Sequence, residues 1–579
     1  MSIVIHRSRI PRPNIWHHFL ASEQTILIVL VVGALAVHCY QLANFNINWD
    51  EFFYLSQVHE YRQGDLELRL QTFHVHFFGW LPSISDNEVD QIIAARAVMF
   101  GLQILTAWLL YRLARRLTAA PAAFLAVAGY LSLSFVIRGG TSFRTDPIAT
   151  CLVMATFDLL LTRAESIWRA ALAGLLLALA AIITIKTAMF LPSLVVVVAV
   201  PLLCGGMTTR AARRTVATAL TAVVGFTFLY ALHTLTLNEG IARPSTDLAM
   251  GSLSKTVITA GFFPQLDTLI LTLRWDLVFW ALWLVGGGVL ARRIWQANGS
   301  ERSRWLEAGA LTLPVASLAV YRNSFPYFYP FILAPASVLT ALAWQSLAAG
   351  RALPTVLKLL ALTWFVASLI LHGIYAPILM PLEHQRTVLA AIHRAFPTPT
   401  PYLDRSSMVA SFPQVGFFMS TWGMEVYVER GEPVLRQAIE QHQPPLLVAN
   451  HPLLDIANAV YPASLLSHPQ LLAADREALA GAYIHHWGPI YVAGKRFKAP
   501  HGAAPTRIDL LIAGRYTLEA ISPVRIDGKV VHSWESVDLA RGAHLVAATA
   551  ASELVTLRWG ETLYRPEYPA PDRPLFLGF

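Results

Sequence analysis

The sequence predicts an α-helical polytopic membrane protein of about eleven transmembrane helices, followed by an extramembrane region of α/β and β-sandwich structure. The first observation is composition: 55% of the 579 residues are hydrophobic and 14% are charged, against about 25% charged in soluble domains. The second is a series of apolar runs, each long enough to cross about 30 Å of hydrocarbon, such as Ile26–Ala43, Ile92–Leu113 and Ala119–Val136. The third is the loss of such runs in the last third of the chain.

The basic residues predict how the spans are oriented. They gather at alternate ends of the apolar runs, so counting crossings places every cluster on one side, which the positive-inside rule makes cytoplasmic. This orientation suits a multi-pass inner (plasma) membrane protein. Nucleic-acid binding is disfavoured because no basic patch is interleaved with aromatic residues. The clusters consist of Arg7, Arg9, Arg12, Arg112, Arg115, Arg116, Arg163, Arg169, Arg210, Arg213, Arg214, Arg292, Arg293, Arg302, Arg304, Arg351 and Lys358.

The opposite, periplasmic side then carries the first loop, residues 44–91, the loop Leu235–Thr272 and everything after Tyr375. We expect residues 1–376 to form the membrane domain. Pro377–Pro401 is punctuated by prolines, as connectors are. It begins an extramembrane α/β region that we place at residues 377–505. A small β-sandwich is expected at residues 506–579.

Short alternating strands separated by turn dipeptides predict the sandwich. The turns are Gly514-Arg515 and Asp527-Gly528, which suit tight hairpins. Upstream, the apolar runs Met408–Ala410 and Leu446–Ala449 are expected to be buried strands. The sandwich strands are expected at Arg507–Ala513, Tyr516–Ile521, Val524–Ile526, Val530–Ser533 and His544–Thr549.

The first candidate site residues are Asp50 and Glu51, which follow Trp49 just past the first span. Two adjacent carboxylates at a membrane interface are costly unless they are hydrated or have a function. A functional pair and a solvated loop start both fit this pattern.

Two histidines, His74 and His76, lie in the same loop. Alternating histidines place two imidazoles on one side of an extended segment. They suit a metal bound together with Asp50 or Glu51, or hydrogen bonds to a phosphate. The alternative is a pair of interfacial histidines that reach from an apolar stretch toward water.

A third candidate is Arg144-Thr145-Asp146-Pro147, at the outer junction of the third and fourth spans. Pro147 suits the first turn of a helix, and the helix dipole favours Asp146 there for structural reasons alone. Arg144 departs from the inside-positive pattern, and phosphate is one reason for an arginine on the outer face.

Two further candidates carry cations. Lys186 stands alone among apolar residues near the outer end of the fifth span, where an ionisable residue marks either a functional site or a snorkelling side chain. The loop from Arg322 to Pro330 joins the ninth and tenth spans and contains Tyr327. The composition of this loop suits binding of an anionic headgroup, and an aromatic belt at the membrane interface would have a similar composition.

All five candidates fall on one face of the membrane, under an orientation set by other residues. Carboxylates together with Lys and Arg at the level of the lipid headgroups suit a substrate with a phosphate and a reacting hydroxyl. The location of the charges favours this over a transporter or flippase of a lipid-linked sugar, which should show inverted repeats and charges at the midplane. A non-catalytic, glycan-binding membrane protein is a further alternative, which leaves Lys186 and Asp50-Glu51 unexplained.

Over roughly residues 20–350 the chain resembles the GT-C superfamily of membrane glycosyltransferases, most of all protein O-mannosyltransferases and lipid A aminoarabinose transferases. Asp50-Glu51 matches the family's Asp-Glu pair, Arg144 to Pro147 its Arg/Asp junction, and Arg322 to Pro330 its basic-x-x-x-Pro-Tyr-x-x-Pro loop. His74 falls where the mannosyltransferases carry His-Pro-Pro. Thr184 to Thr187 is similar to the Thr-Lys-Gly segment.

The chain departs from these motifs in two places. Val75 and His76 stand in place of the two prolines, and Thr187 stands in place of the glycine. These departures bear on the acceptor class and on any metal role of the histidines.

The resemblance implies inverting transfer of a sugar from a polyprenyl-phosphate donor to a glycan, lipid or protein hydroxyl. Together with the site residues, it assigns Asp50 as general base. Glu51 and Asp146 orient the other groups, or hold a divalent cation with His74 or His76. Metal-dependent and metal-free versions both remain open. The groups that stabilise the donor phosphate are Lys186, Arg144, Arg322 and Tyr327.

Overall fold

The computed structural model describes residues 15–67, 70–162, 166–204, 209–237, 261–347, 352–458, 470–499, 505–548, 553–570 and 574–576. The chain divides into two compact units, which we describe separately. The membrane unit comprises Met1–Ala43, Leu68–Phe73 and Arg96–Ala376. The loop–tail unit comprises Asn44–Glu67, His74–Ala95 and Pro377–Phe579. Most of the predicted loop Leu235–Thr272 lies outside the described residues, as do Arg7, Arg9, Arg12, Arg163 and Arg351.

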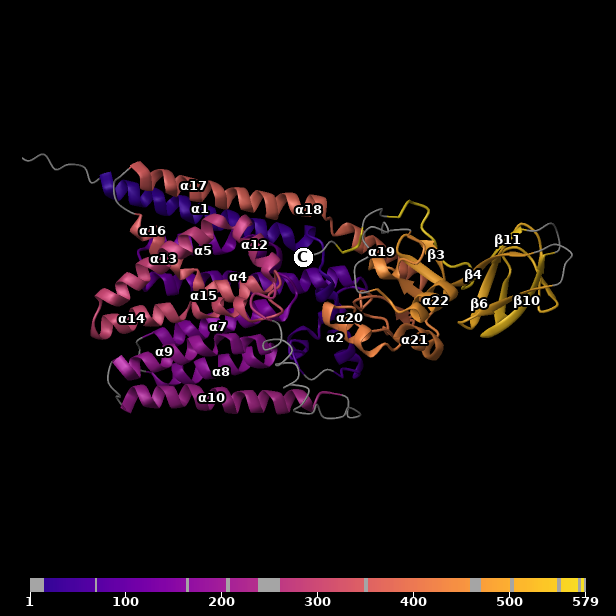
Figure 1. Cartoon of the computed structure of the whole chain (residues 1–579), viewed down its shortest axis with the longest axis horizontal. Coiled ribbons are helices and arrows are strands. Elements are labelled where there is room, and N and C mark those ends of the chain that lie inside the picture. The colour runs from indigo at the N-terminus through magenta and orange to yellow at the C-terminus, as the bar shows by residue number, and fades with distance from the viewer. Residues whose placement is uncertain are drawn as a thin grey trace, which may run out of the picture. The chain divides into compact units, whose positions relative to one another are not determined.

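The membrane unit is a bundle of helices that lie side by side (Figure 1). The runs Ile26–Ala43 and Ile92–Leu113 are helical, and the run Ala119–Val136 is divided between two helices by a break at Ser132 and Leu133. A long α10 packs along α8, α7 along α8, and α13 along α16. The helices are α1 (Ile15–Asn44), α4 (Glu88–Arg115), α5 (Ala120–Leu131), α6 (Ser134–Gly139), α7 (Thr145–Leu161), α8 (Ile167–Ile183), η2 (Ile185–Phe190), α9 (Leu191–Cys204), α10 (Thr209–Thr234), α12 (Leu266–Trp275), α13 (Leu277–Gln296), α14 (Gly299–Ala310), η4 (Leu313–Ala319), α15 (Phe328–Ala336), α16 (Val338–Ser346), α17 (Ala352–Ser368) and η5 (Leu369–Tyr375).

The exposed apolar surface of α10 suits contact with the hydrocarbon of a membrane. Val216, Leu220 and Val223 are each about 60% exposed (62%, 59% and 66%), and in water such a surface is a liability. Five described helices are long and apolar enough to cross a membrane, and a sixth span forms if α15 and α16, bent by 46°, are counted together. The structure therefore agrees with a multi-pass membrane protein, whereas the number of about eleven spans stays a prediction.

The loop–tail unit contains two β-sheets. A seven-stranded sheet has the order β1-β2-β4-β11-β6-β9, with β3 also paired to β4, and a four-stranded sheet has the order β5-β10-β7-β8. Only β1 and β2 are parallel among these pairs of described strands. The strands are β1 (Tyr402–Leu403), β2 (Leu446–Val448), β3 (Tyr483–Trp487), β4 (Ile490–Ala499), β5 (Thr506–Leu510), β6 (Gly514–Glu519), β7 (Val524–Ile526), β8 (Lys529–Val531), β9 (Ser536–Leu539), β10 (Gly542–Ala548) and β11 (Glu553–Trp559).

The sheets bury two separate cores. Helices α21 and α22 pack Leu435, Ile439 and Leu479 against Leu447 and Tyr491 of the sheet. The helices of this unit are α2 (Trp49–Gln63), α3 (Val75–Phe78), η1 (Leu81–Ser83), α18 (Ala376–Leu379), α19 (Glu383–Ala395), α20 (Thr421–Arg430), α21 (Val434–His442), η6 (Pro452–Leu454) and α22 (Ala473–Ala482).

The second core lies between the two sheets and is lined by alternate residues of their strands, such as Leu518, Ile526 and Val546. Asp527-Gly528 closes the β7–β8 hairpin with φ values of 49° and 85°, as a type I′ turn requires. All five sandwich strands predicted from the sequence are present. Because β4 pairs with β11, one sheet runs through both predicted tail regions, and a domain boundary at residue 505 stays a prediction.

The first loop folds with the tail in this unit. Gln385 of α19 hydrogen-bonds both the backbone N–H and the carbonyl of Ile47, each over 2.8 Å, and the carbonyl of Leu575. The buried Glu88 carboxylate accepts hydrogen bonds from Ser411 and His393. The loop that carries Asp50 and Glu51 is therefore anchored by side chains of the tail.

Candidate functional site

A buried cluster of charges lies in the membrane unit at the start of α7. The Lys186 ammonium is 2.7 Å from Asp146 Oδ1, and the Arg144 Nε is 3.3 Å from Asp146 Oδ2. All three side chains are less than 10% exposed (9%, 5% and 4% for Lys186, Arg144 and Asp146). The structure thus brings Lys186 together with Arg144 and Asp146, which belong to a separate motif of the sequence.

Breaks in the helices place these side chains. Arg144 is extended (φ −136°, ψ 165°) and caps α7, so Asp146 falls in its first turn, where the helix dipole favours a carboxylate. Thr184 is also extended (φ −151°, ψ 132°) and separates α8 from η2. Its hydroxyl accepts a hydrogen bond from the backbone N–H of Lys186. The lysine therefore starts a new helical turn within an apolar segment.

Tyr327, directly before α15, completes the cluster. The Arg144 guanidinium lies 3.8 Å, and the Lys186 ammonium 4.5 Å, from the centre of its ring. Cations at these distances are attracted to the ring face. Two cations and one carboxylate give these groups a formal charge of +1, which suits an anionic ligand.

Arg322 lies five residues before Tyr327 in the loop between η4 and α15. Its side chain is partly exposed, and its carbonyl accepts a hydrogen bond of 3.1 Å from Gln265. Its role toward a phosphate stays a prediction.

Asp50 and Glu51 occupy the first turn of α2, in the loop–tail unit. The Asn48 side chain accepts a hydrogen bond from the backbone N–H of Asp50, and Glu51 Oε1 accepts one of 3.1 Å from the N–H of Asn48. This arrangement is a capping box. Glu51 is buried at 1% exposure and Asp50 is partly exposed. The two adjacent carboxylates therefore have different surroundings.

Arg405, which the sequence-based reasoning missed, lies beside this turn. Its guanidinium is 4.0 Å from the centre of the Trp49 ring, and its Nε donates to the carbonyl of Met419. The neighbouring Asp404 is fully buried and accepts hydrogen bonds from three backbone N–H groups and Asn450. Burial outweighs these donors and raises the pKa of Asp404 to about 6. The only signal in the sequence was the pair Asp404-Arg405 itself, inside a region without a recognised motif.

The expectation of an extended segment with two imidazoles on one side is wrong. His74 and His76 lie at the one-turn helix α3. The ring of His74 packs edge-on against Tyr54, to whose carbonyl it donates over 3.2 Å, and the ring of His76 packs against Tyr61. Side chains two residues apart on a helix do not face each other. The two imidazoles therefore contact different neighbours, Tyr54 and Tyr61.

The residues present do not fit a metal site built on these histidines. In the described ranges, no group of three or more His, Cys, Asp or Glu side chains is arranged to hold a metal ion.

The fold of the chain is similar to that of solved membrane glycosyltransferases. One of them is ArnT from Cupriavidus metallidurans bound to undecaprenyl phosphate, with a TM-score of 0.50, 15% identity, and coverage of 73% of this chain and 92% of ArnT. The apo oligosaccharyltransferase of Archaeoglobus fulgidus aligns over 94% of this chain and 98% of its own length, at 9% identity and a TM-score of 0.48.

No family model and no curated protein matches the chain in sequence. At these identities the likeness establishes the fold, and the predicted GT-C resemblance is confirmed at that level.

Proposed function

We propose that this protein is a membrane glycosyltransferase that moves a sugar from a polyprenyl-phosphate donor to an acceptor hydroxyl of a glycan, lipid or protein on the outer, periplasmic face. The observation that carries the proposal is the buried cluster of Arg144, Asp146, Lys186 and Tyr327. It occurs in a chain with the fold of ArnT, which was crystallised with undecaprenyl phosphate.

The cluster suits a phosphate that gains charge as the sugar leaves. Breaking the bond between the anomeric carbon and the phosphate oxygen leaves both electrons on that oxygen. Lys186 and Arg144 are held in place before the reaction, so they can stabilise the new charge without reorganising. Tyr327 fixes both cations through its ring face and presents a hydroxyl as a further donor. Arg322 is proposed as a third cation for the same phosphate.

Asp146 is best understood as a positioning residue. Its carboxylate is already shared between two cations, Lys186 and Arg144. Its proposed role is to hold the Lys186 and Arg144 side chains.

Asp50 is proposed as the general base. The acceptor oxygen forms a bond to the anomeric carbon while its proton passes to the Asp50 carboxylate, and the lipid phosphate departs from the opposite face of the sugar. Inversion follows from this single displacement. Such proton transfer typically accelerates a reaction by about 10²–10⁴-fold. Glu51 supports Asp50 by capping the same helical turn.

The test is turnover by the purified full-length protein. Undecaprenyl-phosphate-linked sugars, supplied singly with a detergent extract of cell-envelope glycans and lipids as acceptor, should release undecaprenyl phosphate and label an acceptor. Transport without release of lipid phosphate would support a flippase instead. Binding of glycans without either outcome would support the non-catalytic alternative.

The side of the membrane needs its own test. In a cysteine-free background, Ser300→Cys should react with a membrane-impermeant maleimide only in inverted vesicles, and Thr398→Cys only in intact cells with a permeabilised outer envelope. Labelling of both positions from one side would overturn the proposed orientation.

A further inference from the structure

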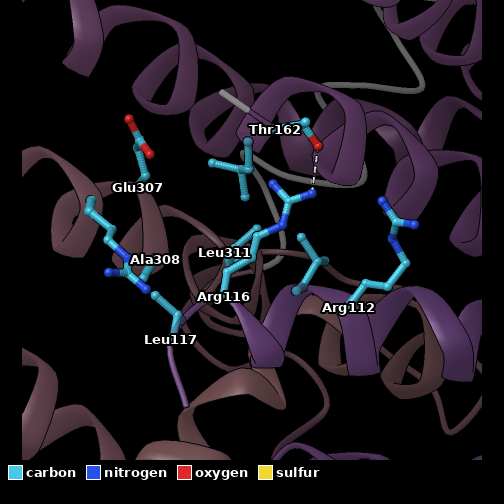
Figure 2. Close-up of a pocket in the computed structure, with 10 residues that line it drawn as sticks. Arg112, Arg116, Leu117, Thr162, Glu307, Ala308 and Leu311 are labelled. Atoms are coloured by element: carbon cyan, nitrogen blue, oxygen red, sulfur yellow. Dashed lines mark hydrogen bonds between the residues drawn. The ribbon is translucent and has the colours of Figure 1, made fainter. Parts of the chain in front are cut away.

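A second basic site lies at the other end of the membrane unit. A pocket of about 480 Å³ opens between the end of α4, the end of α7 and α14 (Figure 2). This volume is in the range of small-molecule sites, about 300–1,000 Å³. The pocket is lined by Arg112, Leu113, Arg116, Leu117, Leu161, Thr162, Arg304, Glu307, Ala308 and Leu311.

This pocket is distinct from the proposed transfer site. Helix α7 has 17 residues and is therefore about 25 Å long. Asp146 lies in the first turn of this helix, and Leu161, its last residue, lines the pocket. The pocket is also at the end where the basic clusters gather, which the positive-inside rule predicts to be cytoplasmic.

Asp158 fixes two arginines of the pocket, Arg112 near the end of α4 and Arg116 directly after that helix. Arg112 Nη2 lies 2.9 Å from Asp158 Oδ2, and Arg116 Nη2 lies 2.7 Å from Asp158 Oδ1. Arg116 Nη2 also donates to the hydroxyl of Thr162 over 2.6 Å, as the dashed line in Figure 2 shows. The guanidinium is therefore held from one side in a fixed orientation.

The other terminal nitrogen of Arg116 is not satisfied. Nη1 is buried and has no hydrogen-bond partner among the described residues. A buried donor without a partner costs about 1–3 kcal/mol or more when charged, so such atoms call for a ligand or a functional reason. Arg112, Arg116 and Arg304 against Asp158 and Glu307 leave a net formal charge of +1 around the pocket.

We infer that this pocket binds a phosphate group, and that its source is the headgroup of an anionic membrane lipid. Arginine suits phosphate because its planar fork donates two parallel hydrogen bonds. The wall of Leu113, Leu117, Leu161 and Leu311 favours a lipid over free phosphate, since it offers apolar surface to the first carbons of an acyl chain. Basic pockets between transmembrane helices recognise anionic headgroups in this way.

The experiment uses the purified full-length protein and native mass spectrometry. Dioleoyl phosphatidylglycerol is titrated, with dioleoyl phosphatidylcholine and inorganic phosphate as separate arms. We expect phosphatidylglycerol to bind in preference to phosphatidylcholine. Arg116→Gln should weaken its binding about tenfold or more, because a charged donor is lost. Arg292→Gln, which removes an exposed arginine of α13 outside the pocket, should change it less than twofold.

A second variant, expected to tighten binding where Arg116→Gln weakens it, prevents misfolding from being mistaken for loss of the site. Arg116→Gln leaves Asp158 paired with Arg112, and its unfolding temperature must match the wild type. Glu307→Gln removes a negative charge from the pocket and should tighten binding by severalfold. Saturable binding of inorganic phosphate that Arg116→Gln abolishes, without selectivity between the lipids, would keep the phosphate site and reject the lipid source. Equal lipid binding by wild type, Arg116→Gln and Glu307→Gln would overturn the inference.

Discussion

The carboxylates of the two units differ in what already surrounds them. Asp146 of the membrane unit is buried between Lys186 and Arg144. In the loop–tail unit, Glu51 is buried and closes a capping box, while its neighbour Asp50 is partly exposed and begins the same helix. The Asp146 carboxylate is already engaged by two cations, and the Glu51 carboxylate is bound to the backbone of Asn48. The comparison therefore favours Asp50 for proton transfer and the other two for support.

Among the substitutions that test this comparison, Asp50→Asn is expected to have the largest effect. Asp50→Asn keeps the size of the side chain and removes the base, so transfer should fall by about 10²-fold or more while donor affinity changes only a few-fold. Single-turnover kinetics with a saturating donor measures this. Near wild-type turnover in a variant of matched stability would make Asp50 structural and move the search for the base to Glu51 or Asp146.

A smaller and different effect is expected at Lys186. Lys186→Ala removes a cation that meets the phosphate in both the ground state and the transition state, so donor affinity and turnover should each fall by roughly tenfold. Lys186→Arg keeps the charge and serves as the matched control. Because the change leaves Asp146 with one cation fewer, unfolding temperatures are compared first. Loss of turnover with unchanged donor affinity would contradict a role in holding the phosphate.

Two substitutions of Glu51 distinguish its role in capping the helix from a role of its negative charge. Glu51→Ala breaks the bond to the Asn48 N–H and should cost about 1 kcal/mol of stability, with a loss of turnover below tenfold. Glu51→Gln retains the capping box, which accepts glutamine, and should behave like the wild type. A hundredfold loss of turnover in Glu51→Gln would show that the charge of Glu51 is needed for the chemistry.

The smallest effect concerns the pH dependence of the loop–tail unit. Burial alone would lower the pKa of His393, but the hydrogen bond and negative charge of Glu88 outweigh it and raise that pKa above its ordinary value. Protonated His393 therefore stabilises the folded unit fully below about pH 6.5, and this contribution is lost as pH rises through the folded-state pKa.

Thermal unfolding followed between pH 5 and pH 9 measures it. His393→Gln should flatten the fall in unfolding temperature over that window, while the exposed His532→Gln should follow the wild type. A parallel fall in all three proteins would show that the Glu88–His393 pair contributes nothing.

Local patterns in the sequence predicted the helices of the membrane unit and one of the two expected hairpins of the tail. The tight hairpin expected at Gly514-Arg515 is wrong, because both residues belong to β6 and the preceding strand β5 pairs with β10 of the other sheet. Hydrophobic periods and turn dipeptides act over a few residues, so the β7–β8 hairpin at Asp527-Gly528 was accessible. The pairing of Lys186 with Asp146 was not predicted as a contact, although both residues were chosen on chemical grounds.

Other features depend on distant partners and could not be predicted. Gln385 hydrogen-bonds the backbone of Ile47, which is 338 residues away in the sequence. No local pattern in the sequence predicts such a contact. Met408–Ala410 was predicted as a strand because it is apolar and buried, and this is wrong: the segment turns around Asp404, whose carboxylate binds the N–H of Met408. Burial was predicted correctly there, and the backbone hydrogen bonds decided the shape.

The most direct test of the central claim needs neither the sugar nor the acceptor. Undecaprenyl phosphate, the expected product, should raise the unfolding temperature of the wild type and of Asp50→Asn. Binding at a hundredfold above Kd adds about 2.7 kcal/mol of stability. Undecaprenol, which lacks the phosphate, should have little effect, and Lys186→Ala should respond weakly. Equal shifts with undecaprenol, or an undiminished shift in Lys186→Ala, would contradict a lipid phosphate held by the cluster around Asp146.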